Sequence, residues 1–518
     1  MNRDKWRPIS AMALLGALLA LAFPPYGLWP LALAGYAPLL WQCRRSAPRR
    51  AAFLGFIFAI GFGVAEMYWL LVVLIEYGQV AWPLAILALL LLTAILALYV
   101  ALFAALTSAL TRAGLSLLLA APMVWTGVEW LRAVALTGFP WLPLGNALAA
   151  ELPLLQSAEI WGVHGLSFLV MLVNALLTRA ALGLGAERRL GGREWAALGA
   201  AAVILAGGWL WGNARLNQVR GEMAEAPTLM TTVVQANVPL IQLWQRQLRE
   251  ANLQKHIDFT RRAAAQINKR PWLVVWSESS APFYLMQEAR ESMMVLRAAK
   301  ELDAYILTGT LGARLKDGRY HPTNRSWLVG PQGEAIGWYD KVHLVPFGEY
   351  VPLEDLFFFV RAVAVTGDNF IPGQKGDTLG MAGLKLGPLI CYESIFPELA
   401  RAQTLQGARL LVNQTNDSWY GRTGASAQHM SHLALRSVEN RRACARSANT
   451  GISGFVLPDG SMADQLGLMS DGLASRELPL MTGLTFYTRH GEALGPLCLI
   501  LALLGGGAAW LRNRRQRG

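Results

Sequence analysis

Residues Leu386 to Ser394 read LGPLICYES, an apolar run that ends on a cysteine followed by polar side chains. The run has the length and composition of a buried β-strand. A helical pattern follows at 397–407, and a second strand pattern at 408–414. This succession predicts a layered α/β domain. Cys391 is expected at the carboxyl end of a strand, where ligands of such domains commonly bind.

The same sequence pattern extends over residues 214–490, where charged residues and prolines separate short apolar runs. Further strands are expected at 228–236, 272–276, 304–310 and 384–390, helices at 240–268 and 289–302, and a hairpin at 326–340. Residues 214–490 are therefore interpreted as one α/β domain.

The rest of the chain has the composition of a membrane protein. Hydrophobic residues make up 54% of the chain and charged residues 15%, whereas soluble proteins carry about 25% charged residues. Candidate membrane spans lie at roughly 9–24, 27–43, 52–75, 82–107, 114–134, 160–182, 195–213 and 493–511. We predict seven spans within residues 1–213, and a last span with a basic tail within 491–518. The predicted fold class is an α-helical membrane bundle of about eight spans plus an α/β domain.

The net charge of +12 does not indicate nucleic-acid binding, because the basic residues flank apolar spans instead of forming one patch. They cluster before the first span, after the second, fourth and sixth spans, and after the last. With eight spans, all these clusters lie on one side, which the positive-inside rule identifies as cytoplasmic. The α/β domain is then expected on the opposite side. Residues 1–35 resemble a signal peptide, but the six spans that follow favour a permanent helix.

Four residues with three kinds of reactive group follow predicted strands: Glu278 after 272–276, Lys341 and Glu349 after the hairpin, and Cys391 after 384–390. A thiolate is a nucleophile, a carboxylate can take the thiol proton, and an ammonium can stabilise an oxyanion. This set suits acyl transfer through a cysteine. Each residue alone has a structural alternative, as a solvated loop charge or a core cysteine. The cysteines show no metal-binding or disulfide spacing, so neither a metal nor a disulfide framework is expected.

The segments WSES, YDKVHLVPFGEYVP and LICYES resemble those of the carbon–nitrogen hydrolase (nitrilase) superfamily, whose triad is Glu, Lys and Cys. With the flanking spans, the whole chain resembles the membrane-bound apolipoprotein N-acyltransferase family. The resemblance implies an αββα sandwich for the α/β domain. WSESS has serine where the family often has proline before the glutamate, which leaves the glutamate itself in place.

Carried over residue by residue, the resemblance implies that Glu278 is the general base, Lys341 the oxyanion-stabilising lysine and Cys391 the nucleophile. Glu349 matches a second, supporting glutamate. Further site positions are matched by Asn324, Tyr392, Glu393 and, on a loop near the lipid entrance, Trp244. No cofactor and no metal are implied.

The reaction implied by the resemblance transfers an acyl chain from a phospholipid, typically phosphatidylethanolamine, to the α-amine of the N-terminal diacylglyceryl-cysteine of an apolipoprotein. A thioester on the cysteine links two half-reactions, so ping-pong kinetics are expected. The implied setting is the bacterial inner membrane, with the α/β domain on the periplasmic side and the chain a monomer. Two apolar segments, 353–365 and 281–286, are predicted to face the lipid, with a buried core helix as the alternative for 353–365.

Two other functions stay open at this stage. A membrane-tethered amidase or nitrilase would use the same residues with water as acceptor and would need no lipid gate. A transporter or scaffold would only bind its partner and would tolerate loss of Glu278, Lys341 or Cys391. Glu66 and Glu129 lie within predicted spans, where each is either functional or paired inside the bundle.

Overall fold

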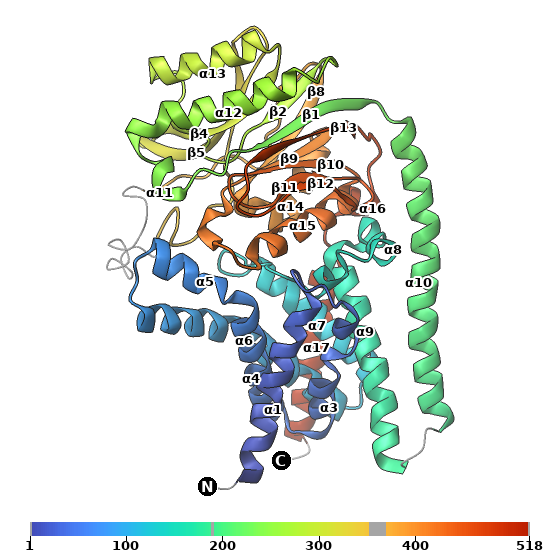
Figure 1. The fold of residues 1–518 in the computed structure, drawn as a ribbon. Coiled ribbons are helices and arrows are strands. Elements are labelled where there is room, and N and C mark those ends of the chain that lie inside the picture. Colours follow the sequence, from blue (N-terminus) through green and yellow to red (C-terminus); the bar gives the residue numbers. More distant parts are fainter. Residues whose placement is uncertain (1–2, 188–190, 352–368, 516–518) are drawn as a thin grey trace. The chain divides into compact units, whose positions relative to one another are not determined.

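The computed structural model describes residues 3–187, 191–351 and 369–515. The chain forms two compact units. A helical unit comprises Met1–Leu71, Ala81–Leu216 and His490–Gly518, and an α/β unit comprises Val72–Val80 and Asn217–Arg489. Figure 1 shows the helices and strands of both units. The predicted class, a helical membrane region with an α/β domain, is confirmed.

The helical unit is built from long apolar helices. Its main elements are α1 (Arg3–Leu19), α2 (Pro30–Gly35), α3 (Ala37–Arg45), α4 (Pro48–Met67), α6 (Trp82–Arg112), α7 (Leu117–Val134), α9 (Ala158–Glu187), most of α10 (Gly192–Glu225) and α17 (Leu494–Arg515). Helix α4 packs against α1 and α6, and α7 packs against α9 and α17. A Cβ atom on Gly16 would lie 1.9 Å from the carbonyl oxygen of Phe58. Glycine at that position therefore lets the backbones of α1 and α4 touch, as small residues do between membrane helices.

Six helices in the described ranges are long and apolar enough to cross a membrane: Pro48–Met67, Trp82–Arg112, Leu117–Val134, Ala158–Gly183, Gly192–Glu225 and Leu494–Leu511. They coincide with six of the eight predicted spans. The first prediction coincides with a shorter apolar helix, Ile9–Ala22. The second, 27–43, consists of two short helices that meet at Tyr36. Pro38 near the start of α3 has no N–H to continue the helical hydrogen bonds, which explains the break.

The two intramembrane glutamates are both buried, with Glu66 3% and Glu129 4% exposed. Glu129 Oε1 accepts hydrogen bonds from the indole Nε1 of Trp125 at 3.1 Å and from the Leu144 backbone N–H at 2.7 Å. Glu129 is therefore paired inside the helical unit. Glu66 lines a cavity of about 50 Å³ together with Arg132.

The α/β unit contains two sheets. The seven-stranded sheet has the order β13-β1-β2-β4-β5-β6, with β3 beside β4, and the six-stranded sheet has the order β12-β11-β10-β9-β8-β7. Strands β1, β2 and β4 run parallel, as do β8, β9 and β10. The strand bounds are β1 Thr228–Gln235, β2 Trp272–Val275, β3 Ala281–Tyr284, β4 Tyr305–Lys316, β5 Arg319–Val329, β6 Ala335–Asp340, β7 Leu379–Met381, β8 Leu384–Ile390, β9 Leu410–Thr415, β10 Ala443–Ala448, β11 Ser453–Val456, β12 Met462–Leu466 and β13 Gly472–Pro479.

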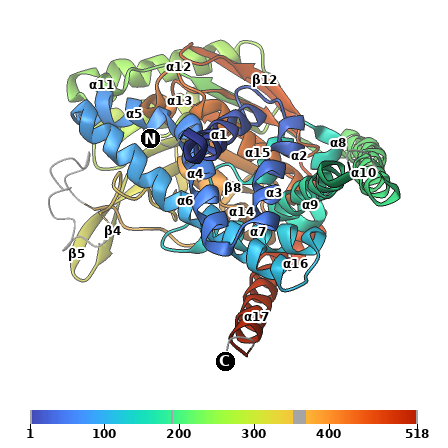
Figure 2. The ribbon, with the colours of Figure 1, turned by 90° about the horizontal axis from the view of Figure 1, so that it is seen from below.

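Side chains that alternate along each strand create two hydrophobic cores. Leu273 belongs to a core that also includes Leu386 and Val412, so the two sheets face each other. Its neighbour Val274 points the other way, into a core with Leu253 of α12 (Arg249–Ala264) and Val295 of α13 (Ala289–Glu301). Helices α14 (Pro397–Leu405) and α15 (Ala425–Asn440) pack on the six-stranded sheet. Figures 1 and 2 show α12 and α13 side by side, and the α/β unit is an αββα sandwich.

One segment from the N-terminal part of the chain packs with the α/β unit. Residues Val73–Tyr77 form a π-helical turn between α5 (Trp69–Val72) and α6. The ring of Tyr77 lies 5.6 Å from that of Trp419, and both pack against a cluster that includes Val238 and Leu243. The sequence interpretation, which placed this region in a membrane span and loop, did not anticipate this contact.

The two segments predicted to face the lipid have different outcomes. Segment 353–365 lies outside the described residues. Segment 281–286 is mostly buried, because Ala281–Tyr284 form β3 and the side chains of Phe283 and Leu285 belong to the core beneath α12 and α13. That prediction is wrong for Ala281, Pro282, Phe283 and Leu285, which are buried, while Tyr284 is half-buried. An apolar run beside a polar loop can equally be a short core strand. Met286 alone is exposed.

Candidate active site

The predicted site residues follow strand ends in both sheets. Glu278 lies three residues after β2, Lys341 directly follows β6, and Cys391 directly follows β8. Asn324 lies on β5 beside the end of β6, where its carbonyl oxygen accepts the Lys341 backbone N–H at 2.8 Å. The pairing of β5 with β6 thus places Lys341 beside Asn324.

The Glu278 carboxylate connects the two sheets. Its Oε1 accepts from Asn324 Nδ2 at 2.8 Å, and its Oε2 accepts the backbone N–H of Asn416, after β9, at 2.8 Å. Burial raises the pKa of Glu278 above its ordinary value, Glu349 adds to the increase, and Lys341 opposes it. Gly309 on β4 lets this loop lie close, because a Cβ there would be 2.5 Å from the Ser279 nitrogen. A buried carboxyl with a raised pKa suits a general base.

The Lys341 ammonium lies between two carboxylates in a site where its side chain is 1% exposed. Its Nζ donates to Glu349 Oε1 at 2.9 Å and lies 3.8 Å from Glu278 Oε1. Burial alone would lower the pKa of Lys341, but Glu349, Glu278 and Cys391 together raise it, so the lysine stays charged. Asn324 Nδ2 also donates to Glu349 Oε1, at 2.9 Å. Glu278, Asn324, Lys341 and Glu349 therefore form one connected cluster.

Removal of the Glu349 charge tests this electrostatic coupling. Glu349 raises the pKa of Glu278, so the Glu349→Gln variant should lower that pKa. A base works only when ionised, so the acid side of the pH profile of kcat/KM should move to lower pH. The maximal rate should also fall, because a glutamine has one acceptor oxygen where Lys341 and the Val345 N–H each donate to a separate oxygen of Glu349. An acid limb that moves to higher pH would contradict the coupling.

Cys391 has a left-handed backbone conformation, with φ of +52°. This conformation is uncommon for a residue with a side chain, and strained residues of this kind cluster at functional sites. The thiol is partly buried against the core between the sheets. Burial raises the pKa of Cys391, Glu278 raises it further, and Lys341 lowers it. The thiol is therefore protonated at rest and needs a base in order to react.

Glu393 is a fully buried carboxylate that holds the backbone around the cluster. It accepts from the Tyr339 hydroxyl and from the backbone N–H groups of Val342, His343 and Ile390, at 2.6 to 3.1 Å. Burial raises the pKa of Glu393 to about 7, while these backbone donors lower it. Glu393 thus links the backbone just before Cys391 to the backbone just after Lys341. These hydrogen bonds fix the positions of Cys391 and Lys341 relative to each other.

The last two predicted residues differ in their surroundings. Tyr392 is buried, with its ring 5.8 Å from His343 and 5.0 Å from Phe396. Burial raises the pKa of Tyr392, and the nearby Lys341 opposes the increase. Trp244 ends the short helix α11 (Leu240–Leu243) and is 45% exposed. No contact found in the described ranges joins Trp244 to Glu278, Lys341 or Cys391.

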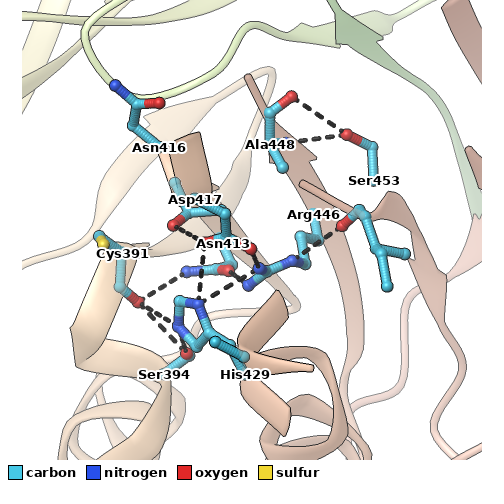
Figure 3. A network of polar contacts seen from close by, with 12 residues as sticks. Cys391, Ser394, Asn413, Asn416, Asp417, His429, Arg446, Ala448 and Ser453 are labelled. Atoms are coloured by element: carbon cyan, nitrogen blue, oxygen red, sulfur yellow. Dashed lines mark hydrogen bonds and ion pairs between the residues drawn. The ribbon is translucent and has the colours of Figure 1, made fainter. Parts of the chain in front are cut away.

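A second group of buried polar residues lies behind Cys391 and was not predicted. It contains Asn413 of β9, Asp417, His429 of α15 and Arg446 of β10, all of them fully buried (Figure 3). The polar stretch NQTND at 413–417, which directly follows the apolar part of β9, is a local signal for part of this group. Nothing in the local sequence marks His429 or Arg446.

The fold and the buried cluster of Glu278, Asn324, Lys341 and Glu349 indicate the class of protein. An αββα sandwich with a glutamate, a lysine and a cysteine at strand ends is the arrangement of a carbon–nitrogen hydrolase domain, here in a chain that also carries apolar membrane-length helices. Residues 209–483 match the family model for carbon–nitrogen hydrolase, and residues 15–176 match the model for the apolipoprotein N-acyltransferase N-terminal domain.

Curated relatives identify the family within that class. The chain is 38% identical to apolipoprotein N-acyltransferase of Geobacter metallireducens, over 97% of this chain and 95% of the relative. It is 32% identical to that of Nitrosomonas europaea, over 99% of both. This chain belongs to the apolipoprotein N-acyltransferase family. A solved amidase from Nesterenkonia sp. aligns with 52% of this chain and 94% of its own, at 22% identity and a TM-score of 0.35.

Proposed function

We propose that this protein transfers an acyl chain from a phospholipid to the α-amino group of the N-terminal diacylglyceryl-cysteine of apolipoproteins, through a thioester on Cys391. The observation that carries the proposal is the buried cluster beside Cys391, in which the charges of Glu278 and Lys341 act on the thiol and Glu349 binds the Lys341 ammonium. Family membership and the apolar helices support a lipid donor and a lipoprotein acceptor.

In the first half-reaction, the Glu278 carboxylate takes the proton of the Cys391 thiol. The thiolate attacks an ester carbonyl of the phospholipid, and the Lys341 ammonium with a backbone N–H stabilises the oxyanion. When the tetrahedral intermediate collapses, the ester C–O bond breaks. The lysophospholipid oxygen takes the proton from Glu278 and leaves, and the acyl chain remains on the sulfur.

In the second half-reaction, the lipoprotein amine attacks the thioester carbonyl. Glu278 accepts the proton that the amine loses, the C–S bond breaks, and the thiolate recovers a proton from Glu278. The amide product leaves the free enzyme. Water must be kept from the thioester during the exchange, because hydrolysis would waste the acyl chain.

The proposed setting is the bacterial inner membrane, with the α/β unit on the periplasmic side. The support is the positive-inside rule, which assigns the basic clusters beside the apolar spans to the cytoplasm. We propose phosphatidylethanolamine as the donor and a monomer as the acting form. Glu278, Lys341 and Cys391 all come from one chain, so the mechanism needs no second copy.

The test is mass spectrometry of the full-length protein in detergent micelles after incubation with phosphatidylethanolamine. The peptide that contains Cys391 should gain the mass of one acyl chain and lose it when a diacylated lipopeptide with a free amine is added. A matched Cys391→Ala protein should show no acyl mass. An acyl-enzyme on the Cys391→Ala protein would overturn the proposal. Loss of the acyl mass as free fatty acid at the same rate without lipopeptide would instead favour the amidase-like hydrolase.

A further inference from the structure

The carbonyl oxygen of Cys391 is held by three side chains. Asn413 Nδ2 donates to it at 3.3 Å, the Ser394 hydroxyl at 3.2 Å, and His429 Nε2 lies 3.0 Å from it (Figure 3). A backbone carbonyl has two lone pairs and seldom attracts so many side chains. These contacts fix the peptide plane that follows the strained Cys391.

His429 Nε2 lies 3.0 Å from the Cys391 carbonyl oxygen and 2.8 Å from Ser394 Oγ, so a hydrogen on Nε2 faces both of these oxygens. Burial and the nearby Arg446 lower the pKa of His429, and Asp417 opposes this decrease. We assign the N–H hydrogen of the neutral ring to Nε2, because this places a donor toward the Cys391 carbonyl oxygen. Nδ1 can then accept from the Arg446 guanidinium, which lies 3.2 Å away. Asp417 Oδ1 also lies 3.1 Å from Nδ1, and the same oxygen accepts from the Thr415 hydroxyl at 2.9 Å.

Arg446 and Asp417 form a fully buried ion pair behind the histidine. The guanidinium Nη2 of Arg446 donates to Asp417 Oδ2 at 2.6 Å, and its Nη1 donates to the side-chain oxygen of Asn413. The guanidinium therefore orients Asn413 with its –NH2 group toward Cys391. A buried ion pair gives little net stability compared with apolar residues of the same size. Stability alone therefore does not explain why Arg446 and Asp417 are buried here.

We propose that Asn413, Asp417, His429 and Arg446 form a positioning unit that holds the Cys391 backbone, through its carbonyl oxygen, in the geometry required for thioester formation. In this role the unit acts through the Cys391 backbone. Arg446 and Asp417 orient His429 and Asn413, and these two hold the carbonyl together with Ser394. The inference rests on the proposed role of Cys391 as the nucleophile.

The expected effect is on the rate of acylation and not on lipid binding. Misplacement of a reacting group by about 1 Å can lower a rate about 10²-fold. The His429→Leu variant should therefore form the acyl-enzyme about 10²-fold more slowly, with less than a threefold change in KM for the phospholipid. His429→Gln should restore much of the rate, because the glutamine Nε2 can replace the N–H that faces Cys391.

The experiment measures acyl-enzyme formation in a single turnover with phosphatidylethanolamine, by mass spectrometry of the Cys391 peptide at successive times. The amplitude reports how much protein is folded and active, and the rate constant reports the geometry of the active fraction. His432→Leu is the matched control. It removes an equally buried histidine from the same helix, and no described contact joins it to Cys391. Its rate constant should equal that of the wild type.

Ser394→Ala is a milder variant that removes one donor and should fold normally. Loss of one hydrogen bond corresponds to about a 2- to 12-fold slower acylation. The proposal is overturned if His429→Leu and Ser394→Ala lower only the amplitude and leave the rate constant unchanged. It is equally overturned if His432→Leu slows acylation as much as His429→Leu does. Acylation of a Cys391→Ala protein would instead refute the role of the nucleophile, which keeps the two failures distinct.

Discussion

The Lys341→Met protein should lose at least about 10³-fold of its acyl-transfer rate, and its free energy of unfolding should fall by about 3–5 kcal/mol. Lys341 is the cation between Glu278 and Glu349, which lie 3.8 and 2.9 Å from its Nζ. Its removal leaves two buried carboxylates that repel each other, and this accounts for the loss of stability. The rate falls because no ammonium remains to stabilise the oxyanion or the thiolate.

Two measurements separate these effects. Thermal unfolding in detergent gives the stability, and single-turnover acylation below the lowered unfolding temperature gives the rate. Lys385→Met is the control, since Lys385 is on the surface of the same unit and donates only to the Gln406 carbonyl in the described contacts. A Lys341→Met protein that kept more than a tenth of the wild-type rate would rule out the proposed role of the lysine.

The Glu278→Gln protein should lose a factor of about 10²–10⁴ in both half-reactions, the range for loss of a general base. Both carboxylate oxygens of Glu278 accept from N–H groups, of Asn324 and Asn416. A glutamine must turn its –NH2 group toward one of these donors, so one of the two hydrogen bonds is also lost. The variant keeps the size of the side chain and removes its basicity.

The pH dependence of the Glu278→Gln rate distinguishes a base from a structural residue. Without Glu278, the Cys391 thiol must lose its proton to solvent, and its raised pKa places that step at high pH. The residual acylation rate should therefore climb steadily as the pH rises, while the wild-type rate levels off. Glu301→Gln, which alters an exposed carboxylate on α13, should behave as the wild type. A Glu278→Gln rate that stays flat with pH would argue for a purely structural role.

Several elements could be predicted because their signal is local. The strands near Trp272, Leu384 and Leu410 and the helices near Ala289 and Pro397 were all expected from their apolar spacing, and all are present. Glu278, Lys341 and Cys391 could be singled out because each follows such a strand, and the resemblance to a known family then related them to one another. Their catalytic roles remain predictions until the variants are measured.

Other features depend on contacts that no local pattern records. The segment 281–285 has the composition of a lipid-facing loop but forms a core strand, because helices α12 and α13 cover it. Residues Val73–Tyr77 pack with Trp419, more than 300 positions away along the chain, and their own sequence gives no sign of it. The second predicted span is apolar throughout but is broken at Tyr36 by Pro38.

The amino-acid sequence by itself determined the helical membrane region, the α/β class and the strand-end positions of Glu278, Lys341 and Cys391, because hydrophobic periodicity and the residues that interrupt it are local properties. The resemblance to a known family indicated Asn324 and Glu349, and the tertiary structure places both in one hydrogen-bonded cluster with Glu278 and Lys341. Only the tertiary structure decided that His429 contacts the Cys391 backbone and that Arg446 lies behind His429. Parallel pairing of β9 with β8 and β10 brings together side chains far apart along the chain. Burial in a region of low dielectric then gives their charges the strength to act on one another.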